Sequence, residues 1–430
     1  MKYLILVPDG AADVSVENEK TPLEEANIPV INGLAMRGRV GLVRTIPRGV
    51  PPGSDAANLA VLGYDPKKDL TGRSPLEAVS MGIELGGHDV AFRTNLVTLA
   101  AQDGQNEDDY KSLTIIDHAS GDISDEEAHV LIDFVDSVLG SGDPANEGRI
   151  HFYPGVSYRH ALVVKDGPVT KNGIGNVFAD YPDYALIPPH DILGRQIGLY
   201  LPDKKNEDYI LDMMSKSYGL LKDHEVNKKR IEQGLRPANS IWIWGEGIRP
   251  LLAPITDKYG VNGTVISAVD LIKGIGICAG LDPVKVEGAT GTIHTNFRGK
   301  GEAAIDTFKR GMDLAYIHVE APDECAHQGD REGKIKSLEL IDEKIVAPIL
   351  AWLEENREKT GEEFRVLIVP DHRTPVVIRT HTDEPVPYVF YDSAAAEAGL
   401  FNKRNAFTER SAMAGEPVNS GRELADGFFG

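Results

Sequence analysis

Four short apolar runs constrain the fold of this chain more than any other feature. They begin at residues 3, 240, 314 and 364 and read YLILVPDG, SIWIWGEG, LAYIHVEA and FRVLIVPDH. Continuous apolar runs of this length, each ending in polar or glycine residues, are typical of strands buried on both faces of a mainly parallel sheet. Helical stretches alternate with these runs. The pattern predicts an α/β fold with helices on both faces of the sheet.

Carboxylate or imidazole side chains follow three of these four runs. They are Asp9, then Asp323 with His327, then Asp371 with His372. In open parallel sheets, active-site groups gather just beyond the carboxyl ends of the strands. We therefore expect these side chains to converge at one edge of the sheet.

The pattern of apolar and polar residues changes between about residues 85 and 230, where the sequence predicts exposed loops and amphipathic helices. ISDEEAHVLIDFVDSVL predicts a helix with Ser124 as its N-cap, and EDYILDMMSKSYGLLKDHEVNKKRIEQG predicts one long helix or a helical pair. Candidate ligands lie on both sides of this region. We therefore predict an inserted, smaller α+β domain at 81–235, within a discontinuous domain formed by 1–80 and 236–430.

The candidate ligands suit divalent metal ions. Asp323 and His327 have i, i+4 spacing, which places both on one face of a helical turn. Asp371 and His372 are adjacent at a strand end and could reach two neighbouring ions, and His381 follows in a loop nine residues later. With Asp9, they give three carboxylates and three imidazoles, enough for two ions. Mixed oxygen and nitrogen ligands favour Mn²⁺ or Zn²⁺ over Ca²⁺.

Ser54 is the candidate nucleophile. It lies in GVPPGSDAANLAVLGYDP, after a Gly-Pro-rich loop and before an apolar helical run. A serine in this place is also an ordinary helix N-cap, so the pattern alone leaves both interpretations open. A helix N-terminus stabilises an approaching anion, and coordination to a metal is one way to ionise a serine hydroxyl.

Composition narrows the class of protein. The 430 residues carry a formal net charge of -21, which argues against a nucleic-acid partner and requires any phosphate site to be locally cationic. No apolar run approaches the roughly 20 residues of a membrane span, and no small-residue cleavage site follows the opening MKYLILVPDG. Two cysteines, Cys278 and Cys325, cannot supply a disulfide framework, so we expect a cytoplasmic protein.

Eight segments, in this order along nearly the whole chain, resemble the archaeal-type branch of the cofactor-independent phosphoglycerate mutases, members of the alkaline-phosphatase superfamily. They are PPGSDAANLAVLGYDP, TGRSPLEA, VSYRHALVV, PPHDILG, PANSIWIWGEG, VISAVDLIKGIG, HVEAPDECAHQGD and VPDHRTPVVIRTHTDEPVP. The resemblance implies an alkaline-phosphatase-like fold and two divalent ions. It implies that one ion is held by Asp9, Ser54, Asp371 and His372. It implies that the other is held by Asp323, His327 and His381.

The resemblance also implies a reaction on a small phosphorylated metabolite. In this family the phosphate passes from 3- or 2-phosphoglycerate to the serine, and back to the other hydroxyl of the bound glycerate, without 2,3-bisphosphoglycerate. Such a cycle needs basic side chains that hold the substrate's carboxylate and phosphate. The candidates are Arg93, Arg159, Arg195, Arg230, Lys300 and His118.

One segment departs from the family pattern. Archaeal-type mutases usually carry Asp-Arg-Arg-Ala-Gly-Arg in the inserted domain, whereas residues 117–122 here read DHASGD. Losing three guanidinium groups would remove charge-assisted hydrogen bonds to an anionic substrate, unless other residues replace them. His118 and Asp122 would also suit an aminated substrate. The alternatives are therefore a homoserine kinase-like phosphotransferase, a phosphatase on the same metal core, or a metal-stabilised protein without activity.

Overall fold

The chain folds into two compact units. The computed structural model describes residues 1–16, 19–167, 186–202, 208–400 and 406–430. Unit 1 comprises Met1–Leu70 and Pro250–Gly430, and unit 2 comprises Thr71–Arg249. The sequence pattern predicts boundaries at 80/81 and 235/236, whereas the units divide at 70/71 and 249/250. Residues 71–80 and 236–249 therefore belong to unit 2.

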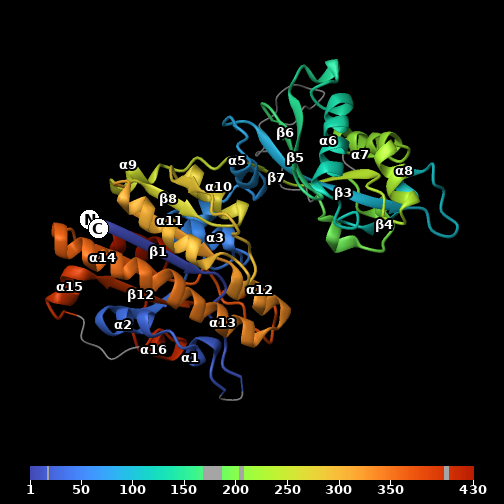
Figure 1. Cartoon of the computed structure of the whole chain (residues 1–430). Coiled ribbons are helices and arrows are strands. Elements are labelled where there is room, and N and C mark those ends of the chain that lie inside the picture. The colour runs from blue at the N-terminus through green and yellow to red at the C-terminus, as the bar shows by residue number, and fades with distance from the viewer. Residues whose placement is uncertain (17–18, 168–185, 203–207, 401–405) are drawn as a thin grey trace. The chain divides into compact units, whose positions relative to one another are not determined.

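Unit 1, in which Figure 1 labels β1, β8 and β12, is built on a sheet of seven strands. Their order is β2-β12-β11-β1-β10-β8-β9. Strands β11, β1, β10, β8 and β9 run parallel, while β12 and β2 add antiparallel strands at one edge. The predicted α/β class with a mainly parallel sheet is confirmed. The strands are β1 (Lys2–Pro8), β2 (Arg39–Val43), β8 (Gly263–Ile266), β9 (Asp282–Val284), β10 (Leu314–Val319), β11 (Phe364–Ile368) and β12 (Val386–Asp392).

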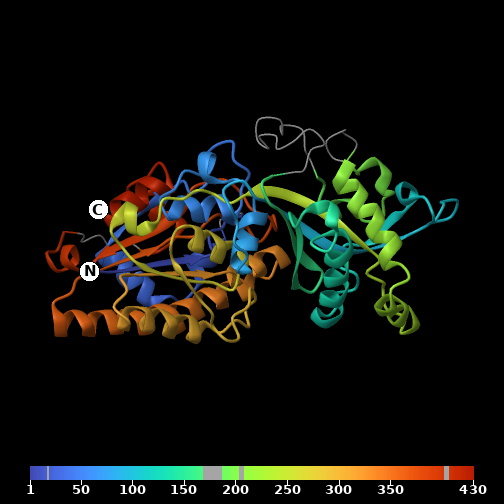
Figure 2. The same ribbon diagram turned by 90° about the horizontal axis from the view of Figure 1, so that it is seen from above.

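Helices cover both faces of this sheet, as Figure 2 shows for the two layers. Alternate residues of β1 point to opposite faces, so Leu4 and Leu6 join one hydrophobic core while Tyr3 packs against Phe428 and Phe429 on the other face. The helices are α1 (Pro22–Glu25), α2 (Pro29–Arg37), α3 (Ser54–Val61), α4 (Pro66–Asp69), α9 (Ile255–Tyr259), α10 (Asp270–Cys278), α11 (Phe297–Lys309), α12 (Ala321–Gln328), α13 (Arg331–Ile341), the π-helix η5 (Asp342–Val346), α14 (Ala347–Thr360), α15 (Ser393–Glu397), α16 (Glu409–Met413) and α17 (Gly421–Phe429).

Unit 2 has an antiparallel sheet of its own, with the order β4-β3-β6-β5 and β7 paired to β3. The strands are β3 (Val90–Ala100), β4 (Thr114–Asp117), β5 (Ile150–Val156), β6 (Arg159–Val164) and β7 (Ser240–Ile248). The run SIWIWGEG forms β7, so its predicted place in the parallel sheet is wrong. Among the described residues β7 pairs with β3 alone, but its residues 240–243 are buried, so its apolar pattern is the same as that of a buried parallel strand.

The helices of unit 2 pack against this sheet. Ser124 is the N-cap of α6 and accepts a hydrogen bond from Glu127 N at 3.3 Å, as predicted. The last helical segment of the unit is a pair, α7 and α8, that breaks near Asp223. The helices are α5 (Ser74–Ser80), α6 (Asp125–Leu139), α7 (Asp208–Leu221) and α8 (Glu225–Glu232), with the short turns η1 (Tyr110–Ser112), η2 (Pro144–Asn146), η3 (Pro189–Ile192) and η4 (Ile197–Leu199).

Candidate active site

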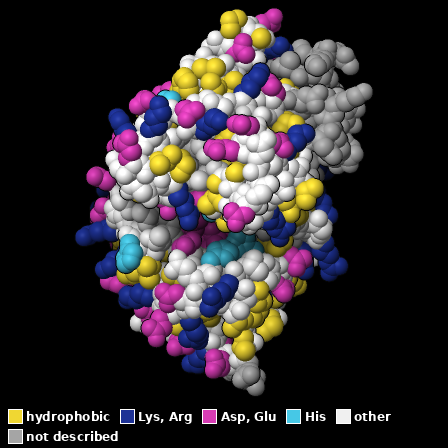
Figure 3. Space-filling model, turned by 90° about the vertical axis from the view of Figure 1, so that its right-hand side faces the viewer, with side chains coloured by type: hydrophobic (Ala, Val, Ile, Leu, Met, Phe, Trp, Pro, Cys, Tyr) yellow, Lys and Arg dark blue, Asp and Glu magenta, His cyan; other side chains and the backbone are white. Residues whose placement is uncertain are grey.

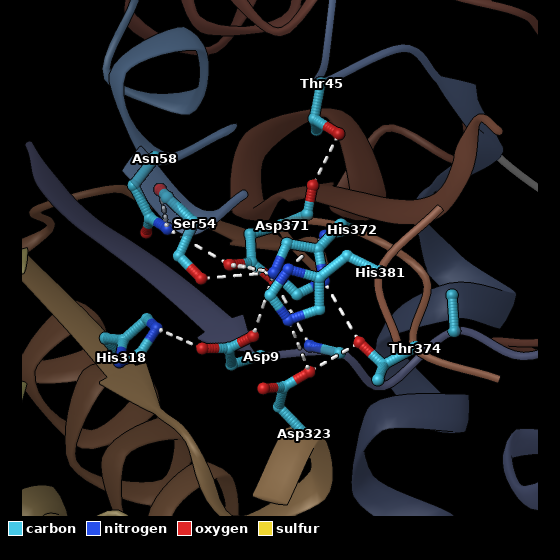
Figure 4. Close-up of polar contacts among 12 residues, drawn as sticks. Asp9, Thr45, Ser54, Asn58, His318, Asp323, Asp371, His372, Thr374 and His381 are labelled. Atoms are coloured by element: carbon cyan, nitrogen blue, oxygen red, sulfur yellow. Dashed lines mark hydrogen bonds and ion pairs between the residues drawn. The ribbon is translucent and has the colours of Figure 1, made fainter. Parts of the chain in front are cut away.

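Three adjacent parallel strands of unit 1 deliver the site. β1 lies between β10 and β11, with Pro8 opposite Val319 and Leu6 opposite Ile368. The residues that follow these strands therefore emerge at the same edge of the sheet. The expected convergence is observed, and Figure 4 shows Asp9, Asp323 and Asp371 around the imidazoles of His372 and His381.

One group of ligand atoms comprises Asp9, Asp371 and His372, all of which are buried. The Nε2 atom of His372 lies 3.5 Å from Asp9 Oδ1 and 3.3 Å from Asp371 Oδ2. Ser54 Oγ lies 3.1 Å from the same Nε2 atom. Four of the residues predicted for one metal are therefore in direct contact.

A second group comprises Asp323, His372 and His381, so that His372 belongs to both groups. Asp323 and His327 share one face of α12, and His327 Nε2 lies 3.0 Å from Asp323 Oδ2. His381 Nε2 lies 3.5 Å from Asp323 Oδ1 and 3.0 Å from His327 Nε2. The residues predicted for the other metal are therefore also brought together.

Ser54 is the first residue of α3 rather than its N-cap. Gly53 occupies the N-cap position and offers no side-chain oxygen to the helix. The Ser54 hydroxyl is therefore not used for capping and points toward His372 (Figure 4). Asn58, one turn later and fully buried, donates hydrogen bonds to Ser54 O at 2.7 Å and to Asp371 Oδ2 at 3.2 Å. This amide fixes the start of α3 to the carboxylate.

The carboxylates of the site repel one another. Burial raises the pKa of Asp9 well above its usual value, and the charges of Asp371 and Asp323 raise it further. Burial likewise raises the pKa of Glu320 to about 7, with a further contribution from Asp323. Among the described residues no Lys or Arg forms a salt bridge with Asp9, Asp323 or Asp371. A bound cation would supply the missing positive charge.

The imidazoles show the same need for a cation. His327 Nδ1 lies 3.0 Å from the carbonyl oxygen of Arg379, which can only accept, so Nδ1 carries a proton. In the neutral ring Nε2 is then bare, yet it faces the Nε2 atom of His381 and the carboxylate of Asp323. The hydrogen bond with Asp323 raises the pKa of His327 to about 9. A proton or a metal ion is required among these acceptors.

Two observations thus show that the residues fit metal ions. Asp9 Oδ1 is buried and has no hydrogen-bond partner in the described part of the chain. The donor set combines carboxylate oxygens with imidazole nitrogens, which are ordinary metal ligands.

Several residues around the ligands were not predicted from the sequence. His318, at the end of β10, has its Nε2 atom 2.9 Å from Asp9 Oδ2, although the two atoms lack hydrogen-bond geometry. Burial lowers the pKa of His318 to about 4, which keeps its ring neutral. Thr45 donates to the carbonyl oxygen of Asp371 at 2.5 Å, and Thr374 contacts both ligand groups. Isolated threonine or asparagine residues carry no spacing signal by which a sequence could reveal them.

Two predicted substrate arginines are engaged within unit 2. Arg93 on β3 forms a bidentate ion pair with Glu77 of α5, and its guanidinium lies 4.7 Å from the ring centroid of Trp244. Arg230 on α8 is buried, pairs with Glu127 of α6 and donates to the carbonyl oxygen of Ser120 at 2.6 Å. Both guanidinium groups therefore connect elements of the unit itself.

The remaining predicted substrate residues differ in their contacts. Lys300 of α11 is fully buried in unit 1 and donates to the carbonyl oxygen of His318 at 2.9 Å. Arg195 is exposed and donates to the hydroxyl of Tyr200 at 2.9 Å. Arg159 is exposed at the start of β6, where its guanidinium lies 5.6 Å from the ring centroid of Tyr158.

Residues 117–122 form a tight turn that Asp117 organises. Its carboxylate accepts from Ala119 N at 2.9 Å and Gly121 N at 2.8 Å, and pairs with Arg236 at 2.6 Å. Ser120, Gly121 and Asp122 follow with positive φ angles of 49°, 67° and 50°. His118 Nδ1 is buried and has no hydrogen-bond partner among the described residues, while its ring packs edge-on against Tyr158.

Acidic and basic side chains are mixed on the face drawn in Figure 3 rather than grouped by sign. No continuous basic area is visible on this face. Within the described part of the chain, no helix combines the length and apolar character that a bilayer span requires.

Comparison with known proteins agrees with this geometry. A family model described as 2,3-bisphosphoglycerate-independent phosphoglycerate mutase matches residues 35–227. A relative of the same description from Methanosarcina barkeri is 44% identical over 417 residues, which are 96% of each chain. A solved structure of a Pyrococcus horikoshii protein matches with a TM-score of 0.75 and 26% identity, over 99% of this chain and 96% of that one.

A second solved structure is described as a cofactor-independent phosphoglycerate mutase. The cofactor-independent phosphoglycerate mutase from Thermoplasma acidophilum matches with a TM-score of 0.62 and 25% identity, over 99% of this chain and 98% of that chain. The resemblance predicted from eight sequence segments is confirmed. The chain therefore belongs to the archaeal-type 2,3-bisphosphoglycerate-independent phosphoglycerate mutases, a family of isomerases.

Proposed function

We propose that the enzyme interconverts 3- and 2-phosphoglycerate through a phosphoserine at Ser54, with two divalent metal ions. One observation carries the proposal: Ser54 Oγ lies 3.1 Å from His372 Nε2, where two groups of ligands meet. A serine hydroxyl held among carboxylates and imidazoles at a sheet edge is suited to attack phosphorus.

The assignment of the ligands to two ions follows the family resemblance, because His372 belongs to both groups of ligand atoms. Asp9, Ser54, Asp371 and His372 would hold one ion, and Asp323, His327 and His381 would hold the other. When bound, the ions would lower the pKa of the serine hydroxyl and offset the negative charge of the phosphoryl group. The mixed ligand set favours Mn²⁺ or Zn²⁺.

Each half of the reaction exchanges one phosphorus–oxygen bond for another. Ser54 Oγ forms a bond to phosphorus as the bond between phosphorus and the substrate's ester oxygen breaks. The proton that leaves the serine is balanced by the proton that the released substrate hydroxyl gains. In the second half the other hydroxyl of the glycerate takes the phosphate, and Ser54 regains its proton. No phosphate is gained or lost, so 2,3-bisphosphoglycerate is not required.

The chain's own groups orient the nucleophile and the phosphate. Asn58 holds the backbone of Ser54 against Asp371. The first turn of α3 begins at Ser54 without a side-chain cap. Backbone N–H groups at such a helix start favour an anion.

Unit 2 is proposed to contribute contacts to the glycerate portion. Because Arg93 and Arg230 are paired with Glu77 and Glu127, they are poor candidates. Arg159 has only a ring contact, and His118 has an unpartnered Nδ1 atom, among the described residues. We assign these two side chains to the substrate.

The test compares three reactions of purified, Mn²⁺-loaded protein. With 3-phosphoglycerate alone, ³¹P NMR should show conversion to 2-phosphoglycerate without 2,3-bisphosphoglycerate and without free phosphate. Homoserine with ATP, and a generic phosphate monoester, should give little product. Predominant release of inorganic phosphate, or phosphorylation of homoserine, would contradict the proposal. Protein treated with a chelator serves as the control.

A further inference from the structure

Thr374 connects the two groups of candidate ligands. It lies in the loop that follows β11 and is fully buried. Its hydroxyl donates to Asp323 Oδ1 and lies 3.1 Å from His372 Nδ1 (Figure 4). One side chain thus contacts a carboxylate of one group and the imidazole that both groups share.

The number of protons available decides how these contacts are made. A hydroxyl has one proton to donate, and an ionised carboxylate can only accept. The proton of Thr374 is therefore given to Asp323, and the hydroxyl oxygen must accept from Nδ1–H of His372. A neutral imidazole carries a single ring proton. Its Nε2 atom, which faces Ser54 Oγ, is then bare.

The backbone of Thr374 is fixed at both of its polar groups. Thr374 N donates to the carbonyl oxygen of Ala12 at 3.2 Å, and Thr374 O accepts from Lys334 Nζ at 2.9 Å. Lys334 is fully buried and also pairs with Asp13 at 2.8 Å. Because these bonds hold the loop, the hydroxyl has little freedom to choose other partners.

Gly10 leaves room for this arrangement. A Cβ atom at Gly10 would lie 2.7 Å from Thr374 Oγ1 and 2.4 Å from Asp323 Oδ1. The backbone of Gly10 is also left-handed, with a φ of 60°. A side chain at this position would displace the hydrogen bond between the threonine and the carboxylate.

We propose that Thr374 is a positioning residue that holds His372 in the Nδ1–H tautomer and presents a bare Nε2 atom to Ser54 and to a metal ion. Hydrogen bonds from surrounding groups commonly set the tautomer of a metal-binding histidine in this way. The inference rests on the proposed metal-dependent function. The tautomer, however, can be measured in metal-free protein and does not depend on catalysis.

The first experiment is ¹⁵N NMR of the histidine rings in the chelated parent protein at alkaline pH. A His372→Gln variant identifies the signals of His372. The expected spectrum shows a protonated Nδ1 and a bare Nε2, and added Zn²⁺ should shift the Nε2 signal alone. A proton on Nε2 in the parent protein would overturn the proposal, whether or not the enzyme is a mutase.

The second experiment measures Zn²⁺ and Mn²⁺ affinity by calorimetry in Thr374→Val, Thr374→Ser and the parent. Loss of the hydroxyl should weaken binding by about 10- to 100-fold, whereas serine should restore most of it. Thr264→Val is the matched control, because Thr264 is equally buried in β8 and bonds Thr307 at 2.9 Å. Parent-like affinity in Thr374→Val would overturn the proposal. If that variant does not fold, the tautomer of His372, measured by NMR in the parent and in Thr374→Ser, tests the proposal instead.

Discussion

The sheet edge of unit 1 and the sheet of unit 2 use charged side chains in different ways. In unit 1, Asp9, Asp323 and Asp371 leave the ends of adjacent parallel strands and have no Lys or Arg partner among the described residues. In unit 2, Arg93 and Arg230 lie within secondary structure and pair with glutamates of the same unit. These three carboxylates of unit 1 are thus available to ligands, whereas the two arginines of unit 2 hold their unit together.

This difference shows what makes a charged residue a candidate for function. A buried carboxylate without a cationic partner is costly unless it takes up a proton or a bound cation offsets its charge. A buried guanidinium that is already paired with a glutamate has no such need. The sequence alone presents the carboxylates of unit 1 and the arginines of unit 2 equally as candidates. Only the presence or absence of an ion-pair partner in the structure distinguishes them.

The largest expected effect is that of Ser54→Ala. Removing the hydroxyl removes the covalent intermediate, so kcat should fall by several orders of magnitude while the protein still folds. Steady-state kinetics and a thermal melt measure the two effects. Ser420→Ala is the control, because Ser420 is also at a helix start, where it caps Glu423 N at 3.1 Å. Near-normal turnover in Ser54→Ala would show that the phosphate passes directly between hydroxyls.

Arg230→Met tests whether the paired guanidinium of unit 2 is structural. It would leave Glu127 and the carbonyl oxygen of Ser120 without their partner, and Glu127 is partly exposed. The free energy of unfolding should fall by about 1–3 kcal/mol, with KM little changed. Lys228→Met on the same helix removes an exposed pair with Glu225 and should lower the stability much less than Arg230→Met does. A large rise in KM without loss of stability would contradict this and indicate that Arg230 binds the substrate.

Arg159→Ala should produce the opposite pattern, with the smallest change in stability and a rise in KM. Its guanidinium has no ion pair among the described residues, so its removal should leave the free energy of unfolding within about 0.5 kcal/mol. A charge-assisted contact to the substrate is worth about 1.5–3 kcal/mol, so KM should rise tenfold or more. Arg159→Lys should recover part of the loss. An unchanged KM would remove Arg159 from the substrate site.

The fold and the convergence of the candidate ligands could be predicted because both depend on local patterns. Apolar runs predict buried strands, and Asp9, Asp323 and Asp371 follow directly after three of them. β7 was placed in the wrong sheet because burial on both faces gives the same pattern in parallel and antiparallel strands. The pairing of Arg93 with Glu77 could not be foreseen, because the contact between a strand and a helix is set by tertiary packing. Thr374 has no sequence signal at all, since its role depends on a contact with Asp323 that is 51 residues away.

The proposed activation of Ser54 requires two metal ions beside its hydroxyl. The decisive measurement is the anomalous diffraction of crystals of the Mn²⁺-loaded enzyme. We expect two peaks about 4 Å apart at this edge of the sheet. One should be bound by Asp9, Ser54, Asp371 and His372, and the other by Asp323, His327 and His381. A single peak, or peaks that leave Ser54 without a metal contact, would contradict the proposed activation of the serine.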